Sequence, residues 1–567
     1  MKKLLLSFGL FVTTTYSFGQ VICNQTSPNP TIYSFTQASG WGMDLTIPGN
    51  FVHDTLAVAS DTTGCGTITN ASVSGKIAVI YRGTCNFTVK VQNAVAAGAV
   101  GVLIINNVAA APIPMGGTPT GPVNVPIAMI SQADGASVRA TMAGGPVMFY
   151  IGNKSGFFDD DLALNDIGSM RANVGSLPIS LAQNGTEFSV PLGAWVFNQG
   201  QNDLSNIVLN GTITRNGTSV HNVNSSPVSI LSGDSAFVTL TTYSPASHQA
   251  GDYEIVYTVD FGAADDYAND NTNTNYFTLS DSLWSLCSLD TTIVSKQTYV
   301  RPAELPVNQF ESCIAFKNAN AARVAMDGIY FGGFTITAAD TATVHLDDFE
   351  AFWSLYTWDD PDFTITNGTF DIISQVAYGS FTYPSNGDPL AGETIFMPLT
   401  GGDQGASHYR FVNDQQYLLC IENFQPKLFM AYSDRDHYDL QMETDDLIRF
   451  PNRSDAGDFT PAGFVGLPVP SIALRTSTSL NVSENELVNV SAFPVPAKET
   501  ITVKVQAAGD ASLKIVDMAG REISTQQVKI ENGQFQTSVA GMNAGTYVFT
   551  LDYANGTTSR FNVVVSK

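Results

Sequence analysis

The most regular pattern of apolar and polar positions lies between residues 75 and 107. Continuous apolar runs at 77–81 and 100–105 flank a stretch in which apolar residues recur at helical spacing. That stripe consists of Phe87, Val91, Ala94, Val95 and Gly98, with the polar Lys90, Gln92 and Asn93 around it. The pattern predicts a strand–helix–strand unit with parallel strands. A third strand and a short helix are predicted at 126–130 and 131–140.

Beyond residue 153 the pattern changes to short alternating strands separated by Asn, Gly and Pro turns. Residues 155–280 have the pattern of an immunoglobulin-like β-sandwich, and the aromatic-rich residues 281–475 that of a second sandwich or jelly roll. Residues 476–487 are polar and aperiodic, as in a linker, and 488–567 alternate strictly, as in a small β-domain. The predicted fold is therefore multidomain and mainly β, with an α/β domain at 20–153.

The first nineteen residues have the pattern of a secretory signal. Lys2 and Lys3 precede an apolar core at 4–12, and small or polar residues follow up to Gln20. A bilayer span needs about 20 apolar residues, and neither this core nor any later uninterrupted stretch reaches that length. We therefore expect a protein that is secreted or held on the outer cell surface, without a transmembrane segment.

The charge balance excludes two classes of partner. Only 14% of the residues are charged, and 26 basic residues against 51 acidic ones give a net charge of −25. Nucleic acids and anionic membranes require basic residues that neutralise phosphate. We therefore expect neither as a partner.

Six cysteines in an exported chain favour disulfides. They are Cys23, Cys65, Cys85, Cys287, Cys313 and Cys420. Their number alone leaves the connectivity open.

The strand–helix–strand unit lacks the features of a dinucleotide site, because its first turn has no G-x-G-x-x-G and Gly98 and Gly101 follow the helix. Its motifs resemble instead the protease-associated (PA) domain family. They are Gly75-Lys76-Ile77, Arg82-Gly83-Thr84-Cys85-Asn86-Phe87, Lys90-Val91-Gln92-Asn93-Ala94, Gly98-Ala99, Asn106, Val125-Pro126 and Met129-Ile130.

This resemblance implies a disulfide between Cys65 and Cys85 and a non-catalytic domain that presents loops to proteins or peptides. The candidate binding residues are Arg82, Gly83, Thr84 and Asn86, together with the Pro-, Gly- and Ala-rich loop at 108–125. The alternative is that Arg82 and Cys85 only fasten the turn and that the domain is a spacer.

The last eighty or so residues resemble the C-terminal sorting domain of proteins exported by the Bacteroidetes type IX secretion system. The residues that carry this resemblance are Pro494, Pro496, Asp517, Gly520, Arg521, Gly545, Tyr547 and Lys567. Val495 departs from the family pattern, which usually has Asn there. The resemblance implies that the secretion machinery is a partner and that the chain crosses the outer membrane.

Catalytic motifs are missing from the sequence. None of the six histidines begins an H-E-x-x-H motif, and no G-x-S-x-G occurs. A Ser-His-Asp triad stays open, because its members can lie far apart in a sequence. We therefore favour a non-enzymatic protein.

Acidic clusters offer weaker signals. Asp265, Asp266 and Asp270 supply hard oxygen atoms of the kind that Ca²⁺ prefers, although turn formation explains the same residues. Their loop and the motif at 197–200 resemble bacterial cell-adhesion-related immunoglobulin-like domains. The cluster at 434–439 is predicted to be a solvated loop, and 159–161 a domain junction. No cofactor other than Ca²⁺ is suggested.

A further tripeptide, Asp followed by Ser or Thr and a small or apolar residue, resembles the O-glycosylation acceptor of Bacteroidetes. It occurs at Thr55, Thr62, Ser235, Ser282, Thr291 and Thr341. Taken together, these patterns favour an exported binding protein with PA-domain recognition. The alternative is an extracellular peptidase or glycan hydrolase with its site in 281–475.

Overall fold

The structure is a computed structural model. It describes residues 20–69, 71–289, 298–300, 309–335, 346, 349–385, 392–405, 407–424, 428–433, 435–455, 457–463, 469–478, 490–505, 509–517, 521–553 and 558–567. The chain consists of two compact units, Met1–Ser479 and Leu480–Lys567. The predicted secretory signal lies outside the described residues, as do Thr291, Thr341 and Gly520.

The N-terminal domain is built on one mixed sheet with the strand order β2-β1-β8-β4-β5-β6-β7-β3. Its elements are β1 (Val21–Ser27), β2 (Thr31–Ile32), β3 (Phe35–Gln37), β4 (Phe51–Val58), η1 (Ala71–Val73), β5 (Ile77–Tyr81), α1 (Phe87–Ala96), β6 (Gly101–Ile105), β7 (Ile127–Ile130), α2 (Gln132–Gly144) and β8 (Met148–Asn153). Strands β4 to β7 pair in parallel. The predicted strand–helix–strand unit is therefore present as β5, α1 and β6, and α2 continues beyond its predicted end at 140.

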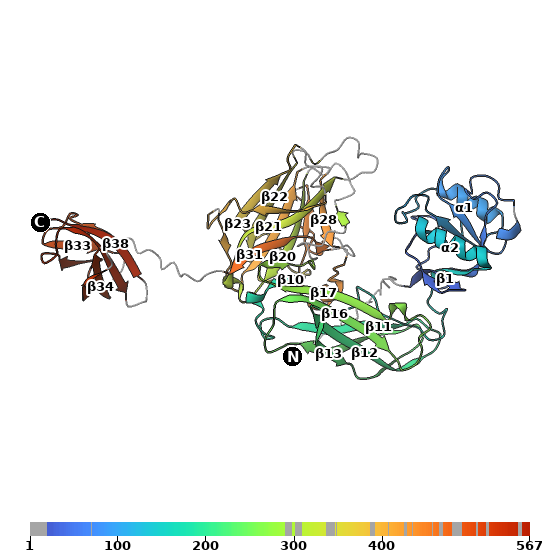
Figure 1. The fold of residues 1–567 in the computed structure, drawn as a ribbon, viewed down its shortest axis with the longest axis horizontal. Helices are drawn as coiled ribbons and strands as arrows, with labels where there is room; N and C mark the ends of the chain where they lie inside the picture. Colours follow the sequence, from blue (N-terminus) through green and yellow to red (C-terminus); the bar gives the residue numbers. More distant parts are fainter. Residues whose placement is uncertain are drawn as a thin grey trace, which may run out of the picture. The chain divides into compact units, whose positions relative to one another are not determined.

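The two helices of this domain cover opposite faces of the sheet. Ala78 and Ile80 share a core with Val91 of α1, whereas Ile77 and Val79 share one with Val138 of α2. Both helices are visible beside the sheet in Figure 1. Because both faces are buried, β5 is an uninterrupted apolar run.

The next segment has the predicted sandwich strands. Sheet β15-β11-β9 faces a second sheet that contains β13-β12-β16-β17-β10. The elements are β9 (Leu162–Ala163), β10 (Ser176–Pro178), η2 (Ile179–Leu181), β11 (Val190–Asn198), β12 (Leu204–Arg215), β13 (Thr218–Asn224), β14 (Val228–Ile230), β15 (Ser235–Tyr243), β16 (Gly251–Asp260), η3 (Ala268–Asp270) and β17 (Thr272–Ser280).

The segment after residue 280 adds a sheet of order β25-β23-β22-β27-β20-β29 and further strands on the sheet of β17. Its elements are β18 (Leu283–Ser285), β19 (Thr298–Val300), β20 (Phe310–Lys317), η4 (Ala321–Arg323), β21 (Val324–Thr335), β22 (Glu350–Trp358), β23 (Ile373–Thr382), β24 (Thr394–Pro398), β25 (Gly401–Gly402), β26 (Tyr409–Arg410), β27 (Gln416–Asn423), β28 (Leu428–Ser433), α3 (Asp439–Asp445), β29 (Asn452–Ser454), β30 (Val469–Pro470) and β31 (Ala473–Thr478). Strand β31 enters the predicted linker at 476–487.

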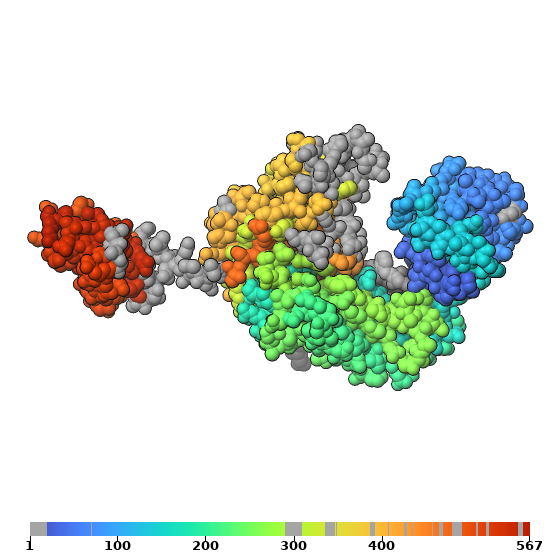
Figure 2. Space-filling model, viewed as in Figure 1, coloured from blue at the N-terminus to red at the C-terminus, as the bar shows by residue number. Residues whose placement is uncertain are grey.

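Strand pairing crosses the predicted boundary at residue 280. Strand β10 pairs with β17 on one side and with β18 on the other, and β18 pairs with β31. A single cluster of buried apolar residues runs from Leu162 to Leu474. The green and the yellow-to-orange segments accordingly adjoin in Figure 2.

A buried ion pair joins the same two segments. Arg171 lies 3.0 Å from Asp436, and the backbone N–H and the hydroxyl of Ser288 donate to Asp436 at 2.8 and 2.9 Å. Asp436 is 2% exposed. The prediction of a solvated loop at 434–439 is therefore wrong for Asp436, because the sequence does not show that Arg171 supplies a buried partner 265 residues away.

The C-terminal unit packs sheet β32-β33-β36 against sheet β35-β34-β37-β38. Its strands are β32 (Ser491–Phe493), β33 (Thr500–Lys504), β34 (Gly509–Asp517), β35 (Glu522–Ile530), β36 (Gln534–Ser538), β37 (Gly545–Tyr553) and β38 (Thr558–Val565). With an α/β N-terminal domain and β-sheets elsewhere, the predicted fold class is confirmed.

We expect Arg171→Met to lower the free energy of unfolding of the larger unit by about 3–5 kcal/mol, because the carboxylate of Asp436 would stay buried without its partner. Denaturant titration of the full chain measures the change. The control is Arg475→Met, which breaks an ion pair with Asp327 whose side chains are 38% and 37% exposed. Exposed pairs contribute at most about 1 kcal/mol. Equal losses in the two variants would contradict the assignment.

Candidate binding site of the N-terminal domain

The parallel strands bring three loops to one edge of the sheet. Strands β5, β6 and β7 end at Tyr81, Ile105 and Ile130, which are register neighbours. Ligand-binding loops of open α/β sheets commonly follow the carboxyl ends of such strands. The predicted loops at 82–86 and 108–125 therefore share an edge with the start of α2.

The loop after β5 is fixed by its backbone and by Arg82. The Arg82 guanidinium donates to Asn106 Oδ1 at 3.0 Å, and the Arg82 backbone N–H donates to the Ile105 carbonyl at 2.9 Å. Gly83 and Thr84 have φ of 119° and 70°, so the turn uses the left-handed region that favours glycine. Of the four predicted binding residues, Thr84 and Asn86 are exposed, and Arg82 and Gly83 are partly buried.

A disulfide joins this loop to the turn that carries Cys65. Cys65 and Cys85 are joined, with their Cα atoms 5.8 Å apart. The turn that carries Cys65 is ordered by Asp61, which accepts from the backbone and hydroxyl of Thr63 and from Gly66 N–H. These hydrogen bonds, that of the Thr63 hydroxyl first, lower the pKa of Asp61 to about 2.

Lys90 has a structural role that the sequence pattern does not indicate. The helical pattern predicts Lys90 among the polar residues around the apolar stripe, yet its side chain is fully buried. Its ammonium donates to the Thr63 carbonyl and lies 3.5 Å from Cys65 Sγ. Burial lowers the pKa of Lys90. Only the tertiary fold shows that Lys90 and Asn93 of α1 both bond to the turn at 63–65.

The first half of the loop after β6 is held by two sets of hydrogen bonds. The Asn106 amide donates to the carbonyls of Ala110 and Ala111 at 3.4 and 2.9 Å. Further along, the Trp41 indole donates to the Met115 carbonyl at 2.6 Å. Residues 107–111 between these anchors are exposed.

A groove of about 540 Å³ lies between this loop and β3, within the range of about 300–1,000 Å³ that is common for ligand sites. Apolar side chains and the uncharged polar side chains of Thr36, Gln37 and Ser39 line it. The full lining is Val21, Phe35, Thr36, Gln37, Ala38, Ser39, Gly40 and Pro114. The sequence predicted the loop that supplies Pro114 but not the contribution of β3, because the topology that places β3 beside β7 is not visible in it.

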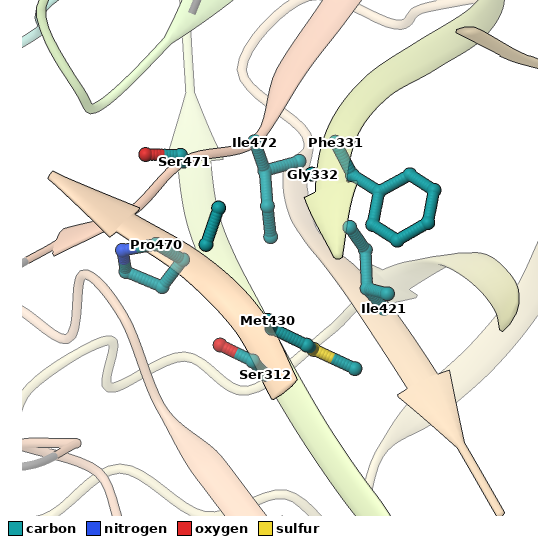
Figure 3. A pocket seen from close by; sticks show the side chains of 9 residues that line it. Ser312, Phe331, Gly332, Ile421, Met430, Pro470, Ser471 and Ile472 are labelled. Atoms are coloured by element: carbon teal, nitrogen blue, oxygen red, sulfur yellow. The ribbon is translucent and has the colours of Figure 1, made fainter. Parts of the chain in front are cut away.

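A second hollow, in the larger sandwich, is a packing gap. It lies among Ser312, Phe331, Met430 and their neighbours, whose side chains are drawn in Figure 3. The side chains leave no space in it for a water molecule. We assign no ligand to it.

The predicted calcium residues bond to the protein itself. Asp265 accepts from the N–H groups of Leu162 and Tyr267, and Asp266 accepts from those of residues 159 and 160. Asp270 lies 2.9 Å from the ammonium of Lys154. These contacts use both oxygen atoms of Asp265 and the Oδ2 atoms of Asp266 and Asp270, and calcium binding by these residues stays a prediction.

The remaining cysteines divide into a pair and two single thiols. Cys313 and Cys420 form a disulfide between β20 and β27. Cys23 and Cys287 are buried as free thiols. Glu311 lies beside the second disulfide, with one carboxylate oxygen within 4.8 Å of both sulfur atoms. It also forms an ion pair with Arg453.

Among the predicted acceptor hydroxyls, Thr62 is exposed, whereas Thr55, Ser235 and Ser282 are partly buried. The Thr55 hydroxyl donates to Asp54 at 3.2 Å. Thr62 is therefore the most accessible of the described candidates, and their modification stays a prediction.

The sorting motif forms turns and strand starts. Asp517 accepts from the Arg521 backbone N–H at 2.9 Å and from its guanidinium at 3.1 Å. Gly545 begins β37, and the Tyr547 hydroxyl donates to the Asn543 carbonyl at 2.9 Å. Pro494 and Pro496 both follow cis peptide bonds, and Lys567 is exposed.

Family models match both ends of the chain. The PA domain matches residues 52–138, and the secretion system C-terminal sorting domain matches residues 491–565. The chain carries a PA domain and a type IX sorting domain. The sorting domain marks an exported protein that is secreted or displayed at the cell surface. Among the described helices, none is long and apolar enough to cross a membrane.

Solved structures give only partial similarity, and no curated protein matches. A zinc aminopeptidase from Bacillus subtilis is 23% identical over 23% of this chain and 30% of its own, with a TM-score of 0.19. An aminopeptidase from Aneurinibacillus sp. strain AM-1 is 22% identical over 24% of this chain and 30% of its own, also with a TM-score of 0.19. The CARDB domain of a Pyrococcus furiosus protein is 19% identical over 23% of this chain and 94% of its own, with a TM-score of 0.17. The chain covers less than a third of either aminopeptidase, so we infer no activity from them.

We expect the double substitution Cys65→Ser and Cys85→Ser to destabilise the PA domain by about 3 kcal/mol, because the cysteines close a loop with a sequence separation of 20. Hydrogen exchange of peptides from α1 and β5 measures the loss within the full chain. The control is Cys23→Ala, which removes a buried thiol without opening a loop. An unchanged exchange rate in the double variant would contradict a fastening role for the disulfide.

Proposed function

We propose that the protein is an exported, non-catalytic binding protein whose PA domain holds short uncharged peptide segments in the groove beside β3. The observation that carries this proposal is the chemistry of the groove. Its lining combines apolar side chains with the amide of Gln37 and the hydroxyl of Ser39, and none of its residues is charged. A peptide presents the same combination, because its backbone requires hydrogen-bond partners while its side chains can be apolar.

The net charge of the whole chain supports an uncharged ligand. At −25, the chain repels acidic partners, and a cationic partner would find no carboxylate in the groove lining. Thr84, Asn86 and residues 107–111 are exposed on the loops at the carboxyl edge of the same sheet.

Ser39→Trp is expected to weaken peptide binding at least about tenfold, which corresponds to about 1.4 kcal/mol, because the indole would occupy the groove. The measurement is fluorescence anisotropy of a labelled library of uncharged and charged peptides with chain 20–567. The control is Ser137→Trp, which adds the same side chain at an exposed position of α2. Binding that Ser39→Trp leaves unchanged would place the site elsewhere, and absence of binding to every peptide would contradict peptide recognition.

One observation favours the hydrolase alternative. Glu311 and Glu422 are cross-strand neighbours, and burial raises the pKa of Glu311 to about 7, as a general acid requires. However, the Glu311 side chain is 1% exposed and forms an ion pair with Arg453. A substrate could not reach it without displacing Arg453, so we assign Glu311 a structural role.

We therefore expect no turnover of mixed protein and polysaccharide substrates by chain 20–567, with or without a chelator. Product analysis by mass spectrometry measures it, and Glu311→Gln serves as the matched variant. Turnover that Glu311→Gln abolishes would overturn the non-catalytic proposal. Turnover that survives in this variant would also overturn it and would place the catalytic site elsewhere.

A further inference from the structure

The PA domain is joined to the following sandwich by a buried charge cluster. The ammonium of Lys154, directly after β8, lies 2.6 Å from Asp161 and 2.9 Å from Asp270. The side chains of Lys154 and Asp161 are fully buried, and that of Asp270 is 16% exposed. Two carboxyl groups therefore face one ammonium in a site from which water is nearly excluded.

Aromatic rings close the cluster. The Lys154 ammonium lies 4.6 Å from the centre of the Tyr267 ring, and the Tyr267 hydroxyl accepts from the amide of Asn24 in β1 at 3.2 Å. Phe158 stacks on Tyr267 at 5.6 Å. Phe157 in turn packs against Tyr150 of β8 in the PA domain, with ring centres 4.7 Å apart. The junction is therefore packed from both sides.

We propose that Lys154, Asp161 and Asp270 form a pH-dependent clasp that holds the PA domain to the sandwich more tightly as the pH falls. With both carboxyl groups ionised, the three side chains carry a net charge of −1 in a nearly dry site, which is costly. Uptake of one proton by either carboxyl makes the cluster neutral. The closed junction, in which the cluster is buried, should therefore bind that proton more strongly than an open junction, in which the carboxyls face water.

The other ionisable groups around the cluster act in the same direction. Asp265 and Asp266, from the loop before η3, add negative charge near Asp161, and Asp161 and Asp270 repel each other. Burial, followed by these repulsions and opposed by Lys154, raises the pKa of both clasp carboxyls above the ordinary value of 3.8. Burial also raises the pKa of Tyr267, so this phenol stays neutral.

The sign of the pH dependence follows from this. In the open junction the carboxyls are solvated and titrate near 3.8, whereas in the closed junction they hold a proton to higher pH. The closed state therefore binds more protons above pH 3.8, and its stability decreases as the pH rises through the raised values. Where the states differ by one proton, the opening constant should increase about tenfold per pH unit.

Hydrogen exchange of chain 20–567 tests the clasp. We expect protection of peptides from 150–162 and 265–271, corrected for intrinsic exchange, to fall at least about tenfold between pH 4.5 and 7.5. Asp270→Asn, which mimics the protonated carboxyl, should remove most of this dependence. Asp260→Asn, at an exposed position of the same sandwich, should leave it intact.

Three outcomes would overturn the proposal. They are equal pH dependence in Asp270→Asn and the unsubstituted chain, loss of the dependence in Asp260→Asn, and protection at the junction that rises with pH. Lys154→Met provides a second arm, because two uncompensated carboxyls should make the dependence steeper. A flatter dependence in that variant would also contradict the clasp.

Discussion

Parallel pairing of β4 to β7 is the constraint on which the PA domain depends. It requires crossover segments between the strands, and α1 and α2 cover both faces of the sheet. It also brings the ends of β5, β6 and β7 to one edge, where their loops must satisfy their own backbone groups. Arg82 and Asn106 do so by bonding the first loop to the second. The two loops are thereby fixed to each other.

Buried charges fasten several parts of the larger unit. Lys90 holds the turn of Cys65, Lys154 holds the junction, and Arg171 joins the two sandwich segments through Asp436. Each cation has a partner far away in the sequence or on another element. Only 14% of the residues are charged, and these three cations are placed where segments meet, in addition to the apolar core and the strand pairing that join the sandwich segments. The same interpretation applies to Glu311 and Arg453, whose pairing opposes a catalytic role.

The sequence allowed local structure to be predicted more completely than long-range contacts. The β5 run and the α1 stripe follow from residue periodicity alone, and the strands of both sandwiches follow from alternation. Asp436 was misplaced because its burial depends on Arg171, and Lys90 because its partner is a carbonyl group. The groove combines β1, β3 and the loop of Pro114, which come together only through the register of the sheet. Register across such distances leaves little trace in one sequence.

The groove and the clasp share a structural element, so they should be coupled. The Lys154 backbone N–H donates to the Gln20 carbonyl at 2.8 Å, and the next residue, Val21, lines the groove and pairs with Asn153. Opening of the junction would also separate Asn24 of β1 from the Tyr267 hydroxyl and so remove a contact that holds this strand, which is one wall of the groove. A peptide that requires this wall in place would bind better to the closed junction. By linkage, its binding would also stabilise the closed junction by the same factor, so occupancy of the PA domain and the attachment of that domain to the sandwich would depend on each other.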